Sequence, residues 1–247
     1  MAALRRPPRS GLLGYDRVLD PPSRIVRQLR LKLQQPVSYR RHDFVAGASN
    51  AAAREQLEAW PNWHGGVLAL VGPEGTGKSH LAKVWVARAG AIEFDRGHLD
   101  LAAAAGRPVL VEDVDRGIEP EALFHLINMA AQPGGGLLLT ARTTPSAWTA
   151  SLPDLRSRLN AMPTAQLDAP DDVVLEGVLR KLFRERNIRA PKEVFPYLLF
   201  RMERSIPVAR EIVRRLDETA DHQQRPISRA LARQILEDDT DNLDLFE

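Results

Sequence analysis

Short apolar runs and helical periodicities divide the chain into two regions of different pattern. Within residues 67–167, continuous apolar runs alternate with amphipathic stretches, which is typical of buried parallel strands connected by helices. A helix is expected to begin near Pro120, because acidic residues such as Glu119 and Glu121 are favoured in the first turn, at the positive end of the helix dipole. The strand-like runs are Val67–Val71, Ala91–Phe94, Pro108–Val111, Gly136–Thr140 and, with a weaker pattern, Ala165–Leu167. This alternation predicts an α/β fold on a parallel sheet with right-handed crossovers.

From Asp168 onward the pattern changes to a helical period, and no convincing strand follows. Val174, Val178 and Leu182 recur every four residues, with charged residues on the opposite face. Further segments with helical spacing begin near Val194, Ser205 and Pro226. We therefore expect a small bundle of four amphipathic helices after the sheet.

These patterns predict four parts in the chain. They are a flexible N-terminal arm rich in Pro, Arg and Gln at residues 1–40, an α/β nucleotide-binding base at 41–168, a helical lid at 169–238 and an acidic tail at 239–247. The absence of cysteine excludes a disulfide framework and a thiolate metal site. No apolar run approaches the roughly 18 residues of a membrane span, and no secretory signal is visible, so a cytoplasmic protein is expected. A net charge of +2 does not by itself indicate a nucleic-acid surface.

A phosphate-binding signature follows the first strand-like run. Gly72–Ser79 match G-x-x-x-x-G-K-[ST], between an apolar strand and an Ala- and Leu-rich helix, which is the context the motif needs. In such a loop backbone N–H groups surround phosphates, Lys78 reaches the β- and γ-phosphates, and the hydroxyl of Ser79 holds Mg²⁺. A glycine-rich turn that matches by chance is the alternative. The expected nucleotide contacts are Pro73, Gly75, Thr76, Gly77, Lys78, Ser79 and His80.

Acidic residues end the third strand-like run, where P-loop ATPases organise Mg²⁺ and the attacking water. Glu112 and Asp113 are the candidate catalytic acids, and Glu112 would share the metal with Ser79. Acidic strand ends that serve no chemistry are the alternative, and Asp115 is expected to be solvated. Thr140 would place a hydroxyl beside the acids, although strand propensity explains a β-branched residue there equally well.

Three arginines are candidates for phosphate recognition. Arg156 and Arg158 precede the weak fifth strand, where an arginine could reach the nucleotide of a neighbouring subunit. Arg210 lies on the third helix of the bundle and points away from its apolar stripe, toward solvent or toward the cleft with the sheet. On spacing alone, solvated surface arginines are the simpler interpretation.

A P-loop α/β unit followed by a small helical lid resembles the AAA+ ATPases. Within that class, three passages resemble the replication initiator DnaA, and the resemblance covers about residues 40–240. The resemblance implies that Phe44 and Val45 contact the adenine, that Arg158 is the arginine finger and that Arg210 is the sensor 2 arginine. The three passages are His42–Asn50, the stretch from Phe124 to Thr140, and Leu155–Arg158.

Two features differ from DnaA, which continues into a helix-turn-helix domain and carries an extra insertion used on single-stranded DNA. This sequence ends at Glu247, and only residues 95–107 separate the second and third strands. A DnaA-like ATPase without those parts resembles the Hda family, the regulatory inactivators of DnaA. That family has a sliding-clamp-binding motif, Q-L-x-L-x-L, in its N-terminal arm. The matching residues here are Gln28, Leu29, Leu31 and Leu33.

The clamp motif has two competing interpretations. An arm that docks as an edge strand on its own domain would show the same alternation of leucines. At the other end of the chain, Asn242–Phe246 resembles the second common clamp peptide, Q-L-D-L-F, with Asn in place of Gln. The position of the N-terminal motif fits the Hda family, so we expect it to be the clamp anchor.

The resemblance implies an adaptor with ADP or ATP and Mg²⁺ that docks on the DNA-loaded sliding clamp of DNA polymerase III. There it would stimulate ATP hydrolysis by DnaA and prevent re-initiation of replication. Glu112 occupies the position at which DnaA has aspartate, so the sequence does not decide whether the chain hydrolyses ATP by itself. A homo-oligomer is also compatible with the sequence. The alternatives are a DNA-acting ATPase, such as a helicase loader or a transposition ATPase, and a clamp-loader-type subunit. The small net charge and the short link favour an adaptor without direct sequence-specific DNA binding. Because no apolar run is long enough for a membrane span, no membrane partner is expected.

Overall fold

The computed structural model describes residues 43–243, with side chains described as far as residue 237. Within that range the chain forms a five-stranded, entirely parallel sheet with the order β2-β3-β4-β1-β5 from edge to edge. The α/β class and its parallel sheet are therefore confirmed, and each strand lies within one residue of its predicted position at either end. The strands are β1 (Val67–Val71), β2 (Ile92–Phe94), β3 (Pro108–Val111), β4 (Gly136–Ala141) and β5 (Thr164–Gln166).

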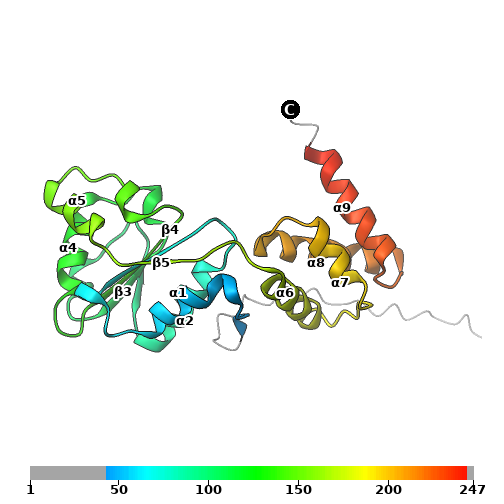
Figure 1. The fold of residues 1–247 in the computed structure, drawn as a ribbon, viewed down its shortest axis with the longest axis horizontal. Helices are drawn as coiled ribbons and strands as arrows, with labels where there is room; N and C mark the ends of the chain where they lie inside the picture. Colours follow the sequence, from blue (N-terminus) through cyan, green and yellow to red (C-terminus); the bar gives the residue numbers. More distant parts are fainter. Residues whose placement is uncertain (1–42, 244–247) are drawn as a thin grey trace, which may run out of the picture. The chain divides into compact units, whose positions relative to one another are not determined.

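Helices cover both faces of the sheet (Figure 1). The helices of this part are α1 (Ala48–Glu58), α2 (Lys78–Ala89), α3 (Leu101–Ala104), α4 (Pro120–Ala130) and α5 (Pro153–Asn160), with 3₁₀ turns η2 (His64–Gly66), η3 (Val114–Arg116) and η4 (Pro145–Ala147). Helix α4 begins where predicted, because the Glu119 carboxylate accepts hydrogen bonds from the N–H groups of Glu121 and Ala122.

Alternating side chains of the inner strand β1 belong to two separate cores. Val67, Ala69 and Val71 pack in the layer that contains α4 and α5. Leu68 and Leu70 pack on the opposite face with α1 and α2. Each leucine that is fully buried in this way contributes about 1.5–3 kcal/mol relative to exposure. The continuous apolar run of β1 thus reflects burial on both faces, as parallel sheets require.

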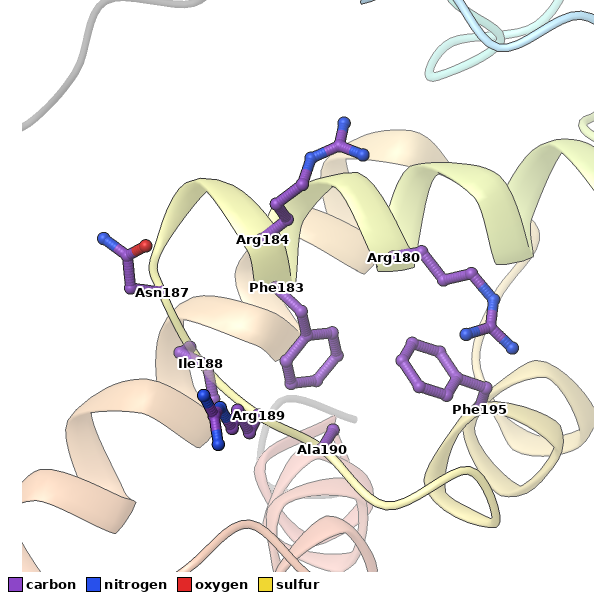
Figure 2. Close-up of a pocket in the computed structure, with 8 residues that line it drawn as sticks. All are labelled: Arg180, Phe183, Arg184, Asn187, Ile188, Arg189, Ala190 and Phe195. Atoms are coloured by element: carbon purple, nitrogen blue, oxygen red, sulfur yellow. The ribbon is translucent and has the colours of Figure 1, made fainter.

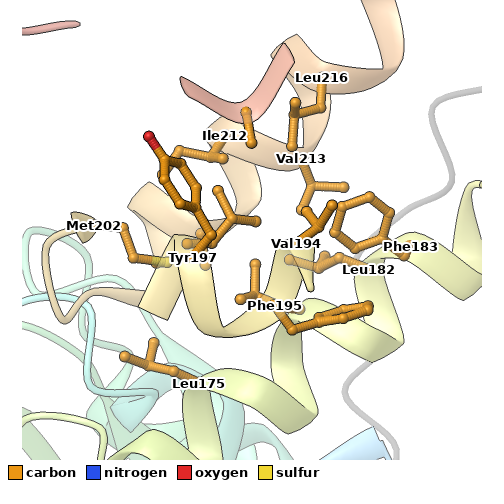
Figure 3. Packing of buried hydrophobic residues seen from close by; sticks show 14 of the residues in the cluster. Leu175, Leu182, Phe183, Val194, Phe195, Tyr197, Met202, Ile212, Val213 and Leu216 are labelled. Atoms are coloured by element: carbon orange, nitrogen blue, oxygen red, sulfur yellow. The ribbon is translucent and has the colours of Figure 1, made fainter. Parts of the chain in front are cut away.

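Four helices follow the sheet and enclose a third core (Figure 3). They are α6 (Asp172–Glu185), α7 (Val194–Arg201), α8 (Ile206–Gln223) and α9 (Arg229–Leu243). Val174, Val178 and Leu182 of α6 are buried, as their spacing predicts. Helix α9 begins at Arg229 and not near Pro226, because the Ser228 hydroxyl accepts a hydrogen bond from the N–H of Leu231 and caps the helix there.

Some predictions concern residues outside the described part of the chain. The arm at residues 1–40, with Gln28, Leu29, Leu31 and Leu33, lies outside it, as do residues 244–247. Helix α9 extends to Leu243, so its backbone includes part of the segment expected as a separate acidic tail. Within residues 43–243 every helix is too short or too polar to span a bilayer.

Candidate nucleotide-binding site

The P-loop connects the buried strand β1 to helix α2 through a backbone that requires glycine. Gly75 and Gly77 have φ angles of +78° and +97°, a region that side-chain-bearing residues rarely adopt. At Gly75 a Cβ would also lie 2.5 Å from the Ser205 hydroxyl. Helix α2 then begins at Lys78, so its N-terminal N–H groups face the loop. This strand–loop–helix unit is the arrangement that binds phosphate groups.

Lys78 is held inside the loop by the loop's own carbonyl groups. Its side chain is only 8% exposed, and Nζ donates hydrogen bonds to the carbonyl oxygens of Gly72 at 2.8 Å and Pro73 at 2.7 Å. Burial lowers the pKa of Lys78, while the nearby carboxylates of Asp113 and Asp115 act in the opposite direction. The two carbonyl oxygens accept hydrogen bonds that phosphate oxygens could accept in their place, so the cation is placed for an anionic ligand.

The acids predicted at the end of β3 lie beside Thr140, as the strand order requires. The backbone N–H of Asp113 donates to the Thr140 hydroxyl at 3.0 Å, and Thr140 is 1% exposed. Asp113 adopts a left-handed conformation with φ of +54°, which is uncommon for a residue other than glycine. Thr140 therefore has a specific role in fixing the acidic turn, beyond strand propensity.

Glu112 is the acidic residue whose surroundings indicate a metal site. Its Oε1 atom is buried and has no hydrogen-bond partner among the described residues. A buried carboxylate oxygen in that condition calls for a cation or a water molecule. Residues 43–237 contain no cluster of three or more acidic or histidine side chains that could hold a metal ion unaided. Mg²⁺ in phosphate-binding sites takes one or two carboxylates plus phosphate oxygens and water, so Glu112 and the exposed Ser79 fit that role.

The expectation of a solvated Asp115 is wrong. Its Oδ2 atom accepts hydrogen bonds from the N–H groups of Arg142 at 2.8 Å and Thr143 at 3.2 Å, while its Oδ1 atom is buried. The carboxylate thus ties the turn after β3 to the turn after β4. The sequence signal that could have shown this is the position of Asp115 just beyond the strand end, where backbone donors of the neighbouring strand's loop converge.

Phe44 and Val45 lie close to the loop and to the lid, respectively. The Phe44 ring contacts His80 edge-to-face at 5.3 Å between centroids, and it lies 3.8 Å from the position of a Cβ on Gly77. Val45 packs against the lid core and lies against Gly177 of α6, which has room for no side chain there. Both residues are half-buried, and their apolar surfaces are available to a planar ring beside the P-loop.

The first turn of α8 contacts the P-loop directly. The N–H of Ile206 donates to the carbonyl oxygen of Gly75 at 3.0 Å, and Ser205 and Pro207 lie around the same glycine. Ser205 precedes α8 as predicted, but its side chain makes no capping hydrogen bond, because its hydroxyl is directed to the loop. Arg210, one turn further along α8, is exposed.

The two arginines of α5 differ in what they contact. Arg156 folds back and donates to the carbonyl oxygen of Ser146 at 2.9 Å. Arg158 is exposed, with its guanidinium 5.1 Å from the centre of the Phe124 ring. The structure thus brings together Pro73 to His80, Phe44, Glu112, Asp113 and Thr140. Arg158 lies on α5 and contacts α4 through Phe124.

The lid also carries a pocket of about 660 Å³ that contains none of these residues (Figure 2). Phe183, Phe195 and Ile188 contribute apolar surface, and Arg180 lies over the Phe195 ring at 4.3 Å. Arg180 is also paired with Glu176 at 2.6 Å. The charge nearest the aromatic side chains is therefore already compensated from within α6.

No family model matches the chain. A curated protein of Haemophilus influenzae, described only as uncharacterized, is 31% identical over 116 residues, which cover 47% of this chain and 50% of that protein. The chain therefore matches about half the length of this curated relative.

Solved structures resemble the chain over most of its length. Domain III of the replication initiation protein DnaA of Thermotoga maritima has a TM-score of 0.68 at 19% identity, and the match covers 83% of this chain and 98% of that one. A structure of DnaA bound to AMPPCP and single-stranded DNA has a TM-score of 0.60 at 19% identity, over 75% of this chain and 68% of that one. The RuvB Holliday junction branch migration motor of Thermotoga maritima has a TM-score of 0.63 at 16% identity, over 81% and 72%. The parallel sheet with its helices therefore has the α/β fold that is found in DnaA and RuvB.

Proposed function

We propose that the chain binds an adenine nucleotide between the P-loop and the start of α8. Phe44 and Val45 would pack against the base, and Gly75 to Ser79 would surround the phosphates. Lys78 supports this assignment, because it is a buried cation whose present partners are only loop carbonyl oxygens. Bound Mg²⁺ would supply charge neutralisation at the terminal phosphates, with Ser79 and Glu112 as the protein's ligands. Arg210 would approach the phosphates from the lid.

The first test is nucleotide binding by Lys78→Ala, measured by calorimetry with ADP and with a non-hydrolysable ATP analogue. Because the variant loses the cation nearest the phosphates, we expect its affinity for both nucleotides to fall by about tenfold or more. Lys83→Ala is the matched control, since Lys83 lies on the same helix and pairs with Glu93. Unchanged ADP affinity in Lys78→Ala would contradict the site assignment.

We further propose that the nucleotide-bound protein is an adaptor that docks on the DNA-loaded sliding clamp and stimulates ATP hydrolysis by DnaA. The supporting observation is Arg158, an exposed cation that contacts Phe124 of α4. An arginine placed in this way can complete the site of a partner, offsetting charge in the transition state. The expected consequence is conversion of DnaA to its ADP form and suppression of re-initiation.

The experiment for this role measures hydrolysis of DnaA-bound ATP with clamp-loaded DNA and the full chain. Arg158→Ala should lower the stimulation by on the order of 10³-fold if the arginine acts as a finger. Arg156→Ala is the matched control, because Arg156 is engaged with the carbonyl of Ser146 on its own surface. Equal stimulation by Arg158→Ala and the unaltered chain would overturn the proposal. If Arg158→Ala instead weakened nucleotide binding by this chain itself, Arg158 would belong to the chain's own nucleotide site.

A DNA-acting ATPase is the second candidate, because the RuvB motor shares the fold. In the described structure the link between β2 and β3 contains only the short helix α3, so it offers little extra surface for a nucleic acid. DNA binding that weakens steeply with increasing salt would favour this candidate.

A further inference from the structure

An ion-pair cluster lies on the P-loop, and the sequence motif does not require it. Glu74, the third residue of the loop, pairs with the guanidinium of Arg142 and lies 3.7 Å from that of Arg116. Arg116 in turn lies 3.6 Å from the carboxylate of Asp113. The cluster therefore connects the phosphate-binding loop to the turns that follow β3 and β4.

Arg142 reaches the loop because its backbone is fixed by two neighbouring elements. It follows β4, which lies between β1 and β3, and its N–H donates to Asp115 at 2.8 Å. The preceding residue, Ala141, accepts a hydrogen bond from the N–H of Gly72 at 3.3 Å, at the base of the P-loop. The side chain of Arg142 is thus anchored beside the loop, on the same edge of the sheet as the acids and Thr140.

Stability alone gives a weak reason for this cluster. The side chains of Glu74, Arg116 and Arg142 are 71%, 44% and 41% exposed, and ion pairs at such exposure contribute little to stability. A carboxylate in this loop also repels the phosphates that the loop is built to hold. The charge of Glu74 therefore weakens phosphate binding, and a role for this residue must come from its pairing with a neighbouring cation.

Arg142 is electrostatically coupled to the interior of the site. The hydrogen bond to Glu74 raises the pKa of Arg142. After the larger effect of burial, the positive charge of Arg142 also contributes to lowering the pKa of Lys78, although Asp113 and Asp115 act against it. Two cations, one buried and one exposed, are thus close enough to influence each other across the loop.

We propose that Glu74 is a counter-ion that holds Arg142 at the loop in the absence of nucleotide, and that the terminal phosphate of a nucleoside triphosphate takes its place. A guanidinium binds phosphate oxygens in the same forked geometry as a carboxylate, so the exchange preserves its hydrogen bonds. A diphosphate lacks the outermost phosphate and leaves Arg142 paired with Glu74. The pair would therefore set the preference of the site between triphosphate and diphosphate. This inference rests on the proposed nucleotide binding.

The test compares the affinities for ADP and for a non-hydrolysable ATP analogue, measured by calorimetry on the full chain. Arg142→Gln should weaken binding of the analogue by about tenfold and change ADP binding by less than about twofold. Glu74→Gln should strengthen binding of both nucleotides, and of the analogue more, because it releases Arg142 and removes the repulsion. When Arg142→Gln is already present, adding Glu74→Gln should no longer strengthen binding of the analogue more than binding of ADP. Thermal unfolding of each variant establishes that it is folded.

Arg116→Gln is the matched control, because Arg116 also faces Glu74 but has Asp113 as a second partner. It should leave the ratio of the two affinities within about twofold of the unaltered chain. An unchanged ratio in folded Arg142→Gln, in a chain that binds nucleotide, would overturn this inference alone. An equal effect of Arg116→Gln would overturn the assignment to Arg142. If the unaltered chain bound neither nucleotide, the proposed function itself would fail.

Discussion

Asp171 links the first helix of the sheet region to the first helix of the lid through both of its carboxylate oxygens. Oδ2 accepts a hydrogen bond from the N–H of Ser49 at 2.9 Å, and Oδ1 accepts one from the N–H of Val174 at 2.8 Å. The N–H of Asp171 donates to the Ser49 hydroxyl at 3.2 Å. These donors, with Ser49 N–H as the largest influence, lower the pKa of Asp171 below its usual value of 3.8.

The ionised form of Asp171 therefore stabilises the fold, and the effect depends on pH. A carboxyl whose pKa is lowered on folding contributes stability above its unfolded pKa and loses it as the pH falls through the folded pKa. Asp171→Ala should lower the free energy of unfolding by about 0.5–2 kcal/mol at neutral pH, as expected for a lost N-cap. Denaturant titrations should show this difference shrinking below about pH 4. A difference that grows with acidification would contradict the assigned role.

Residues with a role in the candidate site were predictable where a motif fixes their chemistry. Lys78, Thr140 and Glu112 could be named because a phosphate-binding loop and a strand end restrict the side chains that can serve there. Arg142 and Asp115 could not, since their roles come from hydrogen bonds between loops that are distant in the sequence. Those contacts depend on the order of the strands, which the sequence pattern does not contain.

The strands were predictable as elements, since burial on both faces produces continuous apolar runs. The run at Val67–Val71 coincides with β1, and the one at Pro108–Val111 with β3. The helix starts were less accurate where a single hydroxyl decides between neighbouring positions, as Ser228 does for α9. The contact between the first turn of α8 and Gly75 could not be predicted, because it joins elements that are about 130 residues apart.

At the scale of the whole molecule, the small net charge conceals an uneven distribution. Arginines are concentrated in residues 1–42, and acidic residues are concentrated at the C-terminal end. Local charge, and not the total, is what a polyanionic or acidic partner responds to. Salt dependence must therefore be measured for binding to the clamp as well as for binding to DNA, so that a specific docking peptide is distinguished from a general attraction by the arm.

The anchor to the clamp is expected to be the segment from Gln28 to Leu33, which lies outside the described residues. In an extended peptide Leu29, Leu31 and Leu33 lie on one side, so they can enter apolar pockets of a partner together. Leu29→Ala combined with Leu31→Ala removes two such side chains, each worth about 1.5–3 kcal/mol when fully buried. Clamp affinity, measured by surface plasmon resonance with the full chain, should fall by about a hundredfold or more.

Two further variants distinguish the N-terminal clamp anchor from the competing C-terminal peptide. Arg30→Ala with Lys32→Ala changes the intervening positions of the same segment, so it should lower clamp affinity much less, and its effect should disappear at high salt. Leu245→Ala with Phe246→Ala changes the competing C-terminal peptide and should leave clamp affinity nearly unchanged. If binding instead survived the leucine changes in the arm and were lost with the C-terminal pair, the anchor would be the C-terminal segment. An adaptor tethered from that end would present its α4–α5 surface, and with it Arg158, from a different attachment point.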